Sequence, residues 1–535
     1  MVSGNYFWDN IIKKDMDYID IGKKKIYTYL SQPISMYDIL EKNAGIFKNK
    51  AAIIDDNGNS YSYQLLLKLT DEFSLYLNTF KNIKEKEHVG ILIHNSIEFC
   101  IALMSISKLS AVSVIFPSKY KKSEIISLYE KSDVSYIICG EEYANYFDNV
   151  EVGIITCKNN TNEYGFKYIY EKGLNFEYKD ASQRSLQDNA IIMFTSGTTS
   201  KSKAVLLKNY NLMHAIVSYK RILDITENDI SIIATPIYHI TGIIALFGLF
   251  IYSGGTLYLH KTFKATKVLE CVKDNKLTLI HASPTVFSLL IEVKEKFPNL
   301  PSLKKFACGS SNMAPENIMT IKSWLPNVDF HTIYGLTETS SPGTIFPIGA
   351  ADSQYIGSSG VPIPGFDVKI VNEENKECNN FEKGEIYVRG TVVLENYYKF
   401  DDNYIENGWL KTGDIGYLND DGYLYVVDRK KDMINRGGEK ICSFDIENEI
   451  YKVEGVLEAA VVGREDAKYV EVPVAMIKLA NGYNYDYKYF YNKLIDNLAK
   501  YQIPVDIIFT KELPKTANGK LNKTEIKKIL NTKRG

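Results

Sequence analysis

An apolar run that opens directly into hydroxyl, glycine and lysine side chains is the strongest constraint in this sequence. Residues 190–194 read Ala-Ile-Ile-Met-Phe, which is typical of a buried strand, and residues 195–203 read Thr-Ser-Gly-Thr-Thr-Ser-Lys-Ser-Lys. Small residues let backbone N–H groups approach anionic oxygens, hydroxyls donate hydrogen bonds, and lysines supply positive charge. The sequence therefore predicts a strand followed by a polyphosphate-binding loop, although a polar turn without a ligand fits the same composition.

Strand and helix patterns alternate along most of the chain. Short apolar runs predict strands, and longer segments with apolar residues every three or four positions predict helices. The expected strands are residues 51–54, 89–94, 111–116, 190–194, 231–235, 257–259, 277–283 and 305–308, and the expected helices are residues 63–80, 96–109, 210–223 and 265–273. This alternation predicts a large α/β domain of layered, mostly parallel sheets. Residues 368–371 and 385–388 alternate apolar and polar side chains, which predicts a smaller antiparallel β subdomain.

The chain is too long for one hydrophobic core, because single cores rarely serve more than about 250–300 residues and this chain has 535. A charged run, Asp-Arg-Lys-Lys-Asp at residues 428–432, follows a predicted strand and fits a hinge better than a core. We therefore expect an N-terminal extension over residues 1–34 and a large domain over residues 35–428. Residues 429–535 are expected to form a small, mobile C-terminal α+β domain.

Composition and charge argue against several classes of function. The formal net charge of −2 provides no basic field for nucleic acid. The least polar segment, residues 240–252, is shorter than the ~20 residues that span a bilayer, and the first residues lack the apolar core of a signal peptide. The seven cysteines include no C-x-x-C pair, which argues against zinc ligation. We expect a cytoplasmic protein with no nucleic-acid partner and no membrane span.

Three further motifs follow the phosphate loop in order. They are Tyr-Gly-Leu-Thr-Glu at residues 334–338, Lys-Thr-Gly-Asp at residues 411–414 and Pro-Lys-Thr-Ala-Asn-Gly-Lys at residues 514–520. With the loop, they resemble the signatures of the adenylate-forming superfamily, which includes acyl-CoA synthetases, aryl-acid ligases, luciferases and peptide-synthetase adenylation domains. The resemblance extends from about Tyr37 to Lys523, and four ordered motifs at compatible spacing make it specific.

The resemblance implies a two-step reaction. A carboxylic acid attacks the α-phosphorus of ATP, pyrophosphate leaves, and the acyl group of the adenylate then passes to a thiol. The implied catalytic residues are Lys520, His239, Thr195 and Glu338, with Glu338 as the ligand of the ATP-bound Mg²⁺. The implied nucleotide-binding residues are Thr195, Ser196, Gly197, Thr198, Thr199, Lys203, Ser310, Ser311, Asn312, Tyr334, Gly335, Thr337, Asp414, Arg429 and Lys520.

The phosphate loop departs from the family pattern at two positions. Ser200 stands where the family usually has a second glycine, and Ser202 replaces the usual proline. Added side chains at these positions are expected to alter the contacts of the loop with phosphate.

The acid pocket is implied by position in the same motifs. Its expected residues are Tyr238, His239, Gly309, Ser310, Ile333, Gly335 and Leu336. Peptide-synthetase domains usually carry an aspartate near His239 to pair an α-amino group, and this chain has none there, which favours an acid without that group. Ser310 and Ile333 are expected to narrow the pocket, which favours an aryl or a short- to medium-chain acyl acid.

The second half-reaction is implied to use another face of the small domain. Lys431 occupies the hinge position of the family, and Gly437, Gly438 and Glu439 lie on the face presented to the thiol arm after the domain rotates. Two adjacent glycines allow a thin pantetheine arm to pass close to the backbone.

Three functions remain open at this point. The first is an acid:CoA ligase that uses ATP, Mg²⁺ and CoA. The second is a stand-alone adenylation enzyme that loads the phosphopantetheine of a separate carrier protein. The third is a catalytically inactive relative that acts as a binding protein, which the retention of Lys203, Glu338, Asp414, Arg429 and Lys520 argues against.

Overall fold

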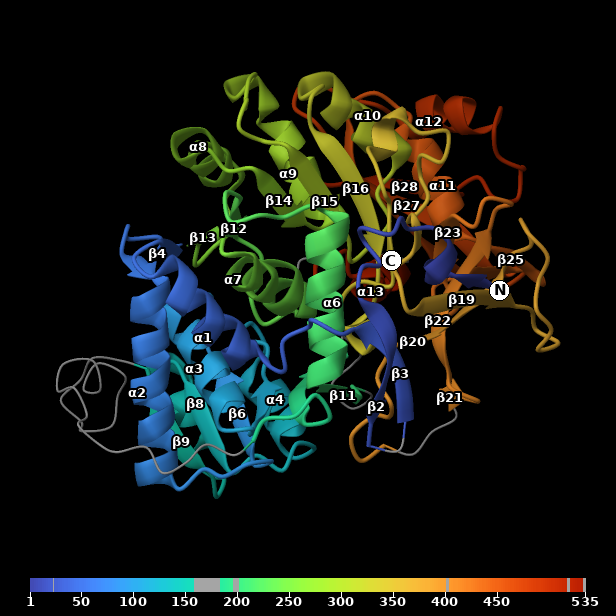
Figure 1. Cartoon of the computed structure of the whole chain (residues 1–535). Helices are drawn as coiled ribbons and strands as arrows, with labels where there is room; N and C mark the ends of the chain where they lie inside the picture. Colours follow the sequence, from blue (N-terminus) through green and yellow to red (C-terminus); the bar gives the residue numbers. More distant parts are fainter. Residues whose placement is uncertain (23, 158–182, 196–201, 401–403, 517–519, 533–535) are drawn as a thin grey trace.

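The computed structural model describes the whole chain except residues 23, 158–182, 196–201, 401–403, 517–519 and 533–535. Its architecture is the predicted layered α/β fold, with two large sheets, a smaller antiparallel β subdomain and a further sheet formed by the last hundred or so residues. Figure 1 shows these units in chain order by colour.

The first large sheet carries the phosphate-loop strand and has the order β11-β10-β7-β6-β8-β9. All neighbouring strands are parallel except β10 and β11. The inner strands are apolar on both faces because helices cover the sheet, and every residue of β7 is buried. The strands are β6 (His88–Leu92), β7 (Val112–Ile115), β8 (Tyr136–Cys139), β9 (Gly153–Thr156), β10 (Asn189–Phe194) and β11 (Ala204–Lys208), and the helices are α1 (Met36–Phe47), α2 (Tyr63–Lys81), α3 (Ile97–Lys108) and α4 (Lys122–Tyr129).

Strand β11 is absent from the sequence prediction, which places a helix directly after the loop. Residues 204–208 read Ala-Val-Leu-Leu-Lys and pair antiparallel with β10 from Asn189↔Lys208 to Phe194↔Ala204. The phosphate loop is therefore the connection of a β-hairpin, and both of its ends are fixed by the sheet.

The second large sheet consists of two runs of strands that adjoin. Their orders are β12-β13-β4-β5 and β14-β15-β16-β17-β18, and the N–H of Thr278 donates to the carbonyl of Ile230 at 2.8 Å where they meet. The strands are β4 (Ala51–Asp55), β5 (Ser60–Ser62), β12 (Ile230–Ile233), β13 (Thr256–Leu259), β14 (Leu279–Ala282), β15 (Lys305–Cys308), β16 (Asp329–Tyr334), β17 (Thr344–Ile345) and β18 (Val361–Pro362), and the covering helices are α8 (Ala265–Asn275), α9 (Pro284–Glu292) and α10 (Pro315–Trp324).

Apolar helices fill the space between the two large sheets. Helix α6 (Asn209–Ile222) contacts β11 on one side, and η4 (Thr241–Gly248), which continues into α7 (Leu249–Ser253), contacts β12 on the other. Figure 1 shows α6 and α7 at the centre of the molecule. The least polar segment of the sequence is thus a core helix, and within the described residues no helix is long and apolar enough to cross a membrane.

The smaller β subdomain is antiparallel, as the alternating pattern predicts. Its order is β1-β19-β20-β22-β21, with β23 beside β22. The first strand comes from the N-terminal extension, and the indole N–H of Trp8 donates to the carbonyl of Pro362 at 2.7 Å, so the extension packs on the large domain. The strands are β1 (Val2–Ser3), β19 (Phe366–Val371), β20 (Gly384–Gly390), β21 (Ile405–Glu406), β22 (Trp409–Leu418) and β23 (Leu424–Arg429), and β2 (Met16–Ile21) and β3 (Lys24–Tyr29) form a separate hairpin.

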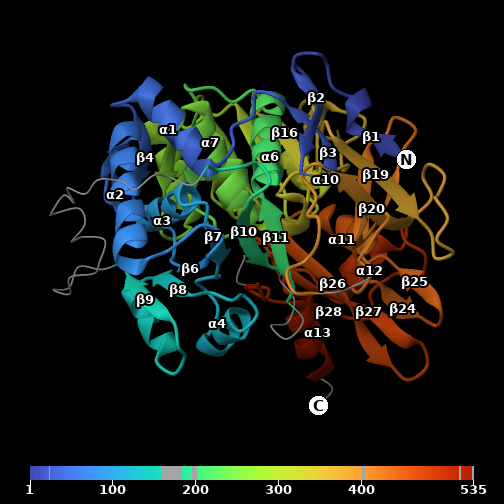
Figure 2. The same cartoon turned by 60° about the horizontal axis from the view of Figure 1, so that its bottom comes forward.

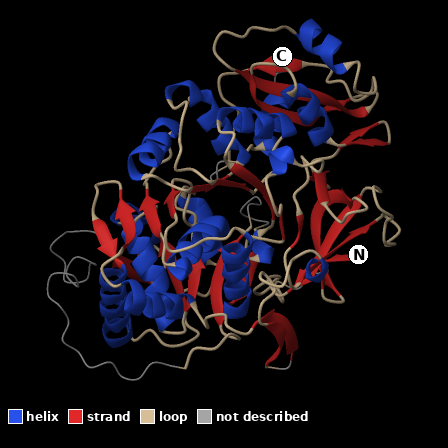
Figure 3. Cartoon of the chain, turned by 45° about the horizontal axis from the view of Figure 1, so that its top comes forward, coloured by secondary structure: helices blue, strands red, loops and turns tan. Residues whose placement is uncertain are grey.

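The chain changes sheets across the charged run. Strand β23 ends at Arg429, and the next strand, β24, begins at Ile434 in a different sheet of order β25-β24-β27-β26, with β28 beside β27. Figures 2 and 3 show this sheet and its helices as a distinct block. The predicted boundary at residue 429 stays a prediction. The elements are β24 (Ile434–Arg436), β25 (Glu439–Ile441), β26 (Val456–Asp466), β27 (Val470–Leu479), β28 (Ile507–Phe509), α11 (Ser443–Tyr451), α12 (Tyr487–Leu494) and α13 (Lys523–Thr532).

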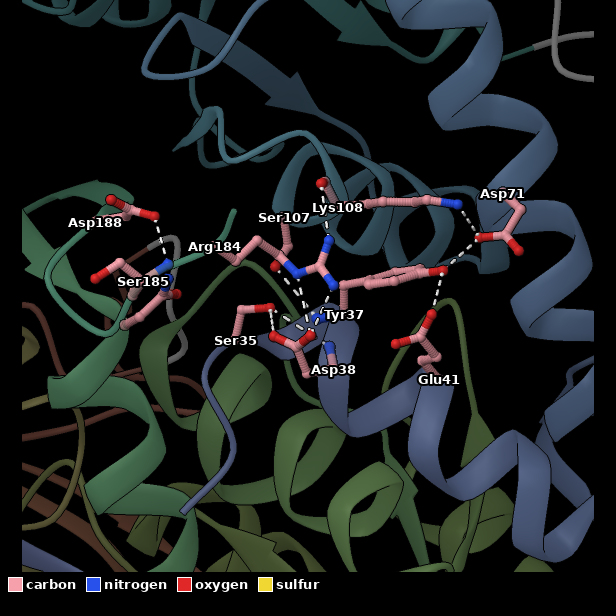
Figure 4. A network of polar contacts seen from close by, with 11 residues as sticks. Ser35, Tyr37, Asp38, Glu41, Asp71, Ser107, Lys108, Arg184, Ser185 and Asp188 are labelled. Atoms are coloured by element: carbon pink, nitrogen blue, oxygen red, sulfur yellow. Dashed lines mark hydrogen bonds and ion pairs between the residues drawn. The ribbon is translucent and has the colours of Figure 1, made fainter. Parts of the chain in front are cut away.

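A polar network fixes the start of the phosphate-loop strand (Figure 4). Arg184 donates from Nε and Nη2 to Oδ1 of Asp38 at 3.0 and 2.8 Å, and its guanidinium lies 4.8 Å from the ring centroid of Tyr37. The next residues lead into β10 through a turn in which the N–H of Ser185 donates to Oδ2 of Asp188 at 2.8 Å. Helix α1 therefore anchors the segment that delivers β10 to the sheet.

We expect Arg184→Gln to lower the apparent melting temperature by roughly 2–3 °C. The side chains of Arg184 and Asp38 are 15% and 21% exposed, so loss of the charged hydrogen bonds costs about 2 kcal/mol. With an unfolding entropy of ~2.1 cal/mol/K per residue, each kcal/mol shifts the midpoint of the large domain by about 1 °C. Differential scanning fluorimetry measures the shift. Lys322→Ala is the control, because Asp352, its partner, is 66% exposed and surface pairs contribute ~0–1 kcal/mol; equal shifts in both variants would contradict the prediction.

Candidate functional site

The base of the phosphate loop is closed by two hydrogen bonds. The N–H of Thr195 donates to the carbonyl of Lys203 at 3.1 Å, and the N–H of Lys203 donates to Oγ1 of Thr195 at 3.1 Å. Ser202, where the family usually has proline, is buried. The remaining predicted loop residues, Ser196, Gly197, Thr198 and Thr199, lie outside the described residues, as does Ser200.

Two predicted site residues, Lys203 and Glu338, meet on a tyrosine that sequence reasoning did not single out. The ammonium of Lys203 donates to the hydroxyl of Tyr397 at 3.2 Å, and that hydroxyl donates to Oε1 of Glu338 at 2.9 Å. Glu338 and Tyr397 are both buried. The loop lysine and the predicted metal carboxylate are therefore linked through one phenol, which the motifs gave no reason to expect.

Tyr334 and the predicted ribose carboxylate also meet directly. The hydroxyl of Tyr334 donates to Oδ2 of Asp414 at 2.9 Å, and Nε of Arg429 lies 3.3 Å from Oδ1 of the same carboxylate. Asp414 and Arg429 are opposite each other in the β22–β23 pair, which fixes their separation. The small residue after Tyr334 is required, because a Cβ on Gly335 would lie 1.5 Å from the carbonyl oxygen of Ser341.

The Asp414 carboxylate has capacity for further donors. Burial raises its pKa above the ordinary value, and Arg429 and the Tyr334 hydrogen bond offset part of that rise. A buried carboxylate accepts several hydrogen bonds when ionised, and each additional donor favours the charged form. Two vicinal hydroxyls of a ribose are donors of that kind, so the site fits the predicted nucleotide.

A small pocket lies beside Tyr334 at the ends of β15 and β16. It is lined by Cys308, Ser311, Asn312, Met313, Thr332, Ile333, Gly357, Ser358 and Ser359. The side-chain amide of Asn312 donates to the carbonyl of Val426. Ser310 adopts φ of 76°, in the left-handed region where glycine is favoured. The predicted adenine-loop residues Ser311 and Asn312 thus lie at one pocket.

Lys520 is brought to this site from the small domain. Its ammonium interacts electrostatically with Asp414 and Glu338 of the large domain, and with Arg429, which ends β23 at the predicted domain boundary. Burial, together with Arg429, lowers the pKa of Lys520 to about 8. The predicted adenylation lysine therefore lies among the predicted ribose and metal carboxylates.

His239 lies on the same side of the site as Lys520. Burial, then Lys520 and His281, lower the pKa of His239 to about 3, so the imidazole is neutral. Its Nδ1 lies 3.2 Å from Oγ1 of Thr241. His281 is buried on β14, where a Cβ on Gly309 would lie 3.8 Å from its Nε2. His281 is a second pocket candidate, which a lone histidine in an apolar strand did not signal.

Most of the other predicted pocket residues lie at or after the ends of β15 and β16. Ile333 is buried, and Leu336 and Thr337 are half-buried at the start of η6 (Thr337–Thr339). A Cβ on Gly309 would lie 3.2 Å from the carbonyl oxygen of Ile333, so the backbone is close-packed there. Tyr238 is also buried, but it follows β12, and its hydroxyl interacts electrostatically with Tyr120 and Tyr143.

The residues of the predicted thiol-transfer face are exposed to solvent, whereas the predicted pocket residues are buried or half-buried. Lys431, Gly437, Gly438 and Glu439 are exposed. Gly437 and Gly438 form the tip of the β24–β25 hairpin with φ of 64° and 98°, which a residue with a side chain rarely adopts. The exposed hairpin is available to a partner or substrate, whereas Lys520 occupies the interdomain site.

Within the described residues, no three His, Cys, Asp or Glu side chains gather into a ready-made metal site. Mg²⁺ that arrives bound to a nucleotide needs no such cluster, because it uses one or two protein carboxylates together with phosphate oxygens and water. The buried carboxylate of Glu338, beside the phosphate-loop lysine, fits that requirement.

Comparison with protein families gives two matches on this chain. The family model described as "AMP-binding enzyme" matches residues 40–398, and that described as "AMP-binding enzyme C-terminal domain" matches residues 445–520. The first match contains the phosphate loop and Glu338, and the second ends at Lys520.

Individual relatives match over 70–99% of their own length. A 2-succinylbenzoate–CoA ligase of Bacillus velezensis is 31% identical over 499 residues, which is 92% of this chain and 97% of the relative. A feruloyl-CoA synthase of an Amycolatopsis species is 32% identical over 348 residues, 64% of this chain and 70% of the relative. Among solved structures, o-succinylbenzoate CoA synthetase of Bacillus subtilis with its acyl-adenylate intermediate matches with a TM-score of 0.80, 27% identity, and coverage of 93% and 99%.

We expect ATP–pyrophosphate exchange to lose about tenfold in kcat/KM between pH 7 and pH 9. The charged form of Lys520 is the one that can stabilise developing negative charge. With a pKa of about 8, this form predominates below pH 8 and is lost above it. The measurement is the pH profile at constant ionic strength.

Lys520→Arg provides the control for this pH dependence. An arginine stays charged beyond pH 12, so the variant is expected to keep its residual activity, whatever its level, across the same range. An identical alkaline decline in the arginine variant would assign the titration to another group.

Proposed function

The chain belongs to the AMP-binding enzyme family and is an AMP-forming acid–thiol ligase, and on that premise we propose that it activates an aryl carboxylic acid with Mg·ATP and transfers the acyl group to CoA. The observation that carries the proposal is the position of Lys520. This lysine of the small domain interacts electrostatically with Asp414, Arg429, Glu338 and His239, which supports one shared site for nucleotide, metal and acid.

The nucleotide half of the site supports the first step. The Asp414 carboxylate can accept hydrogen bonds from ribose hydroxyls, Glu338 would hold Mg²⁺, and Lys203 supplies positive charge at the phosphate loop. Mg²⁺, when bound with the phosphates, neutralises charge as pyrophosphate departs. A solved structure that resembles this chain at 27% identity is described as a complex with ATP and magnesium ion.

The electrostatics of the acid side suit a carboxylate as attacking group. His239 is neutral and Lys520 is mostly charged below pH 8. A protonated Lys520 attracts the substrate carboxylate and can follow the charge as it moves to the α-phosphate. The neutral imidazole of His239 can donate or accept one hydrogen bond without adding charge.

An aryl acid is the substrate class that we favour. The relatives described above are named for 2-succinylbenzoate and ferulate, and both acids carry the activated carboxyl group on an aryl-containing skeleton without an α-amino group. The residues predicted to narrow the pocket, Ser310 and Ile333, are consistent with a flat substrate. We rank 2-succinylbenzoate first among candidates because relatives of this name match more than nine-tenths of the chain.

The second step requires the small domain to move, and the contacts across the domains permit it. Ion pairs that join the two sides include Lys383–Asp445 at 2.9 Å and Lys478–Glu292 at 3.0 Å. Such partly exposed pairs contribute ~0–1 kcal/mol each. Rotation about Lys431 would break these pairs, together with the buried hydrogen bonds from Ser443 to Asp428, while it brings the Gly437–Gly438 hairpin to the acyl-adenylate.

The decisive experiment is acid-dependent ATP–pyrophosphate exchange with Mg²⁺ and a panel of aryl, short-, medium- and long-chain acids and amino acids. We expect exchange with aryl acids and a loss of at least ~100-fold in Lys520→Ala, the scale of removing one preorganised charge. Lys511→Ala, an exposed lysine of the same segment, is the matched control and should retain activity. Exchange with amino acids alone would reject the substrate class.

The acceptor is tested in the same reaction. Addition of CoA is expected to yield the acyl-CoA, detected by mass spectrometry. Adenylate that accumulates with CoA but is discharged by a phosphopantetheinylated carrier protein would favour the carrier-loading alternative. Absence of exchange from folded protein with every acid would favour the inactive relative.

A further inference from the structure

We propose that Tyr397 is a positioning residue for the nucleotide, whose hydroxyl holds the carboxylate of Glu338 and the ammonium of Lys203 apart until Mg·ATP binds. The inference rests on the proposed function, because it concerns the same nucleotide site. It adds a residue that lies outside the four sequence motifs and on which two predicted site residues depend.

The hydroxyl of Tyr397 uses both of its hydrogen-bonding roles. It donates its one proton to Oε1 of Glu338 at 2.9 Å and accepts from the ammonium of Lys203 at 3.2 Å. A phenol has one donor and can accept at the same oxygen, so it joins an anion and a cation without letting them touch. The side chain is buried, and solvent therefore does little to screen the two charges.

The backbone around Tyr397 is fixed to both sides of the site. The N–H of Leu394 donates to the carbonyl of Glu338 at 2.9 Å, and the N–H of Tyr398 donates to the carbonyl of Ala204 at 2.8 Å. Tyr397 also forms a β-bridge with Val205, which follows the loop lysine by two residues. The segment therefore holds the phenol in register with both partners, and the position of its hydroxyl is set by the fold.

The aromatic rings of Tyr397 and Tyr404 also lie against the ammonium of Lys203. The ammonium of Lys203 lies 4.3 Å from the ring centroid of Tyr397 and 3.4 Å from that of Tyr404. The two rings are inclined at 73° with centroids 6.2 Å apart. A cation between such faces is attracted by their negative potential, yet it remains less tightly bound than in a direct ion pair, so phosphate can compete for it.

Loss of the Tyr397 hydroxyl would change how the Glu338 carboxylate and the Lys203 ammonium interact. With phenylalanine at this position, a buried carboxylate and a nearby ammonium lose their shared partner, and direct pairing becomes the favourable alternative. That pair would have to break before Lys203 meets phosphate and Glu338 meets the metal. The cost therefore falls on nucleotide binding, whereas the bound state, in which both groups are engaged elsewhere, is little changed.

Calorimetric titration with Mg·ATP tests the inference without an acid substrate. We expect Tyr397→Phe to raise Kd by ~10-fold, the scale of a hydrogen bond to a charged group. Tyr398→Phe is the matched control, because the neighbouring hydroxyl donates to Asp133 at 2.6 Å; its Kd should match that of the wild type. Thermal melting should show both variants folded, since each retains its ring.

Steady-state exchange then separates positioning from a general structural role. In Tyr397→Phe the KM for Mg·ATP should rise with Kd while kcat stays within about twofold. This pattern is expected when a substitution weakens binding of the substrate and of the transition state equally. In a Glu338→Gln background the lysine has no carboxylate to pair with, so adding Tyr397→Phe should weaken Mg·ATP binding much less than tenfold.

Three results would overturn the inference. They are an unchanged Kd in Tyr397→Phe, an equal weakening in Tyr398→Phe, and full additivity with Glu338→Gln. The proposed function fails by a different result, namely wild-type protein that binds Mg·ATP but supports no exchange with any acid. Wild-type protein that does not bind Mg·ATP would reject both.

Discussion

One buried carboxylate, Asp414, interacts with charged groups at the predicted domain boundary and in the small domain beyond it. Asp414 receives a hydrogen bond from Tyr334 and an ion-pair contact from Arg429 within its own sheet system. Lys520, from the other domain, adds a positive charge that favours the ionised form of Asp414 and is itself disfavoured by Arg429. Glu338 and Asp432 add negative charge to the same group, so Arg429 and Lys520 are balanced by carboxylates and the site carries no excess of positive charge of its own.

That balance also bears on the domain rotation proposed above. Burial lowers the pKa of Lys520, and the ion pairs between the domains are partly exposed. An anionic nucleotide and acid would offset the desolvation of the lysine, and release of pyrophosphate would remove part of that compensation. Under the proposed mechanism, the small domain would therefore be held while the first substrates are bound and released afterwards.

The sequence motifs select residues that the structure brings into electrostatic interaction, and their roles stay predictions; residues joined only by tertiary contacts could not be selected from the sequence. The motifs identify Glu338, Asp414 and Lys520, because each stands in a local pattern with its own chemistry. Tyr397 belongs to no such pattern, and its role arises only because its segment lies between β11 and Glu338. The alternating pattern predicted the parallel strands, whereas the short run of β11 was missed since its pairing with β10 depends on a loop between them.

The N-terminal strand has a consequence for the order of folding. Val2 pairs with Val368, and Trp8 donates to Pro362 across 354 positions of sequence. At roughly 5–20 residues per second, residues that leave the ribosome first wait on the order of tens of seconds before their partners are synthesised. The pairing of β1 with β19 therefore forms late in synthesis, after the chain has reached residue 368.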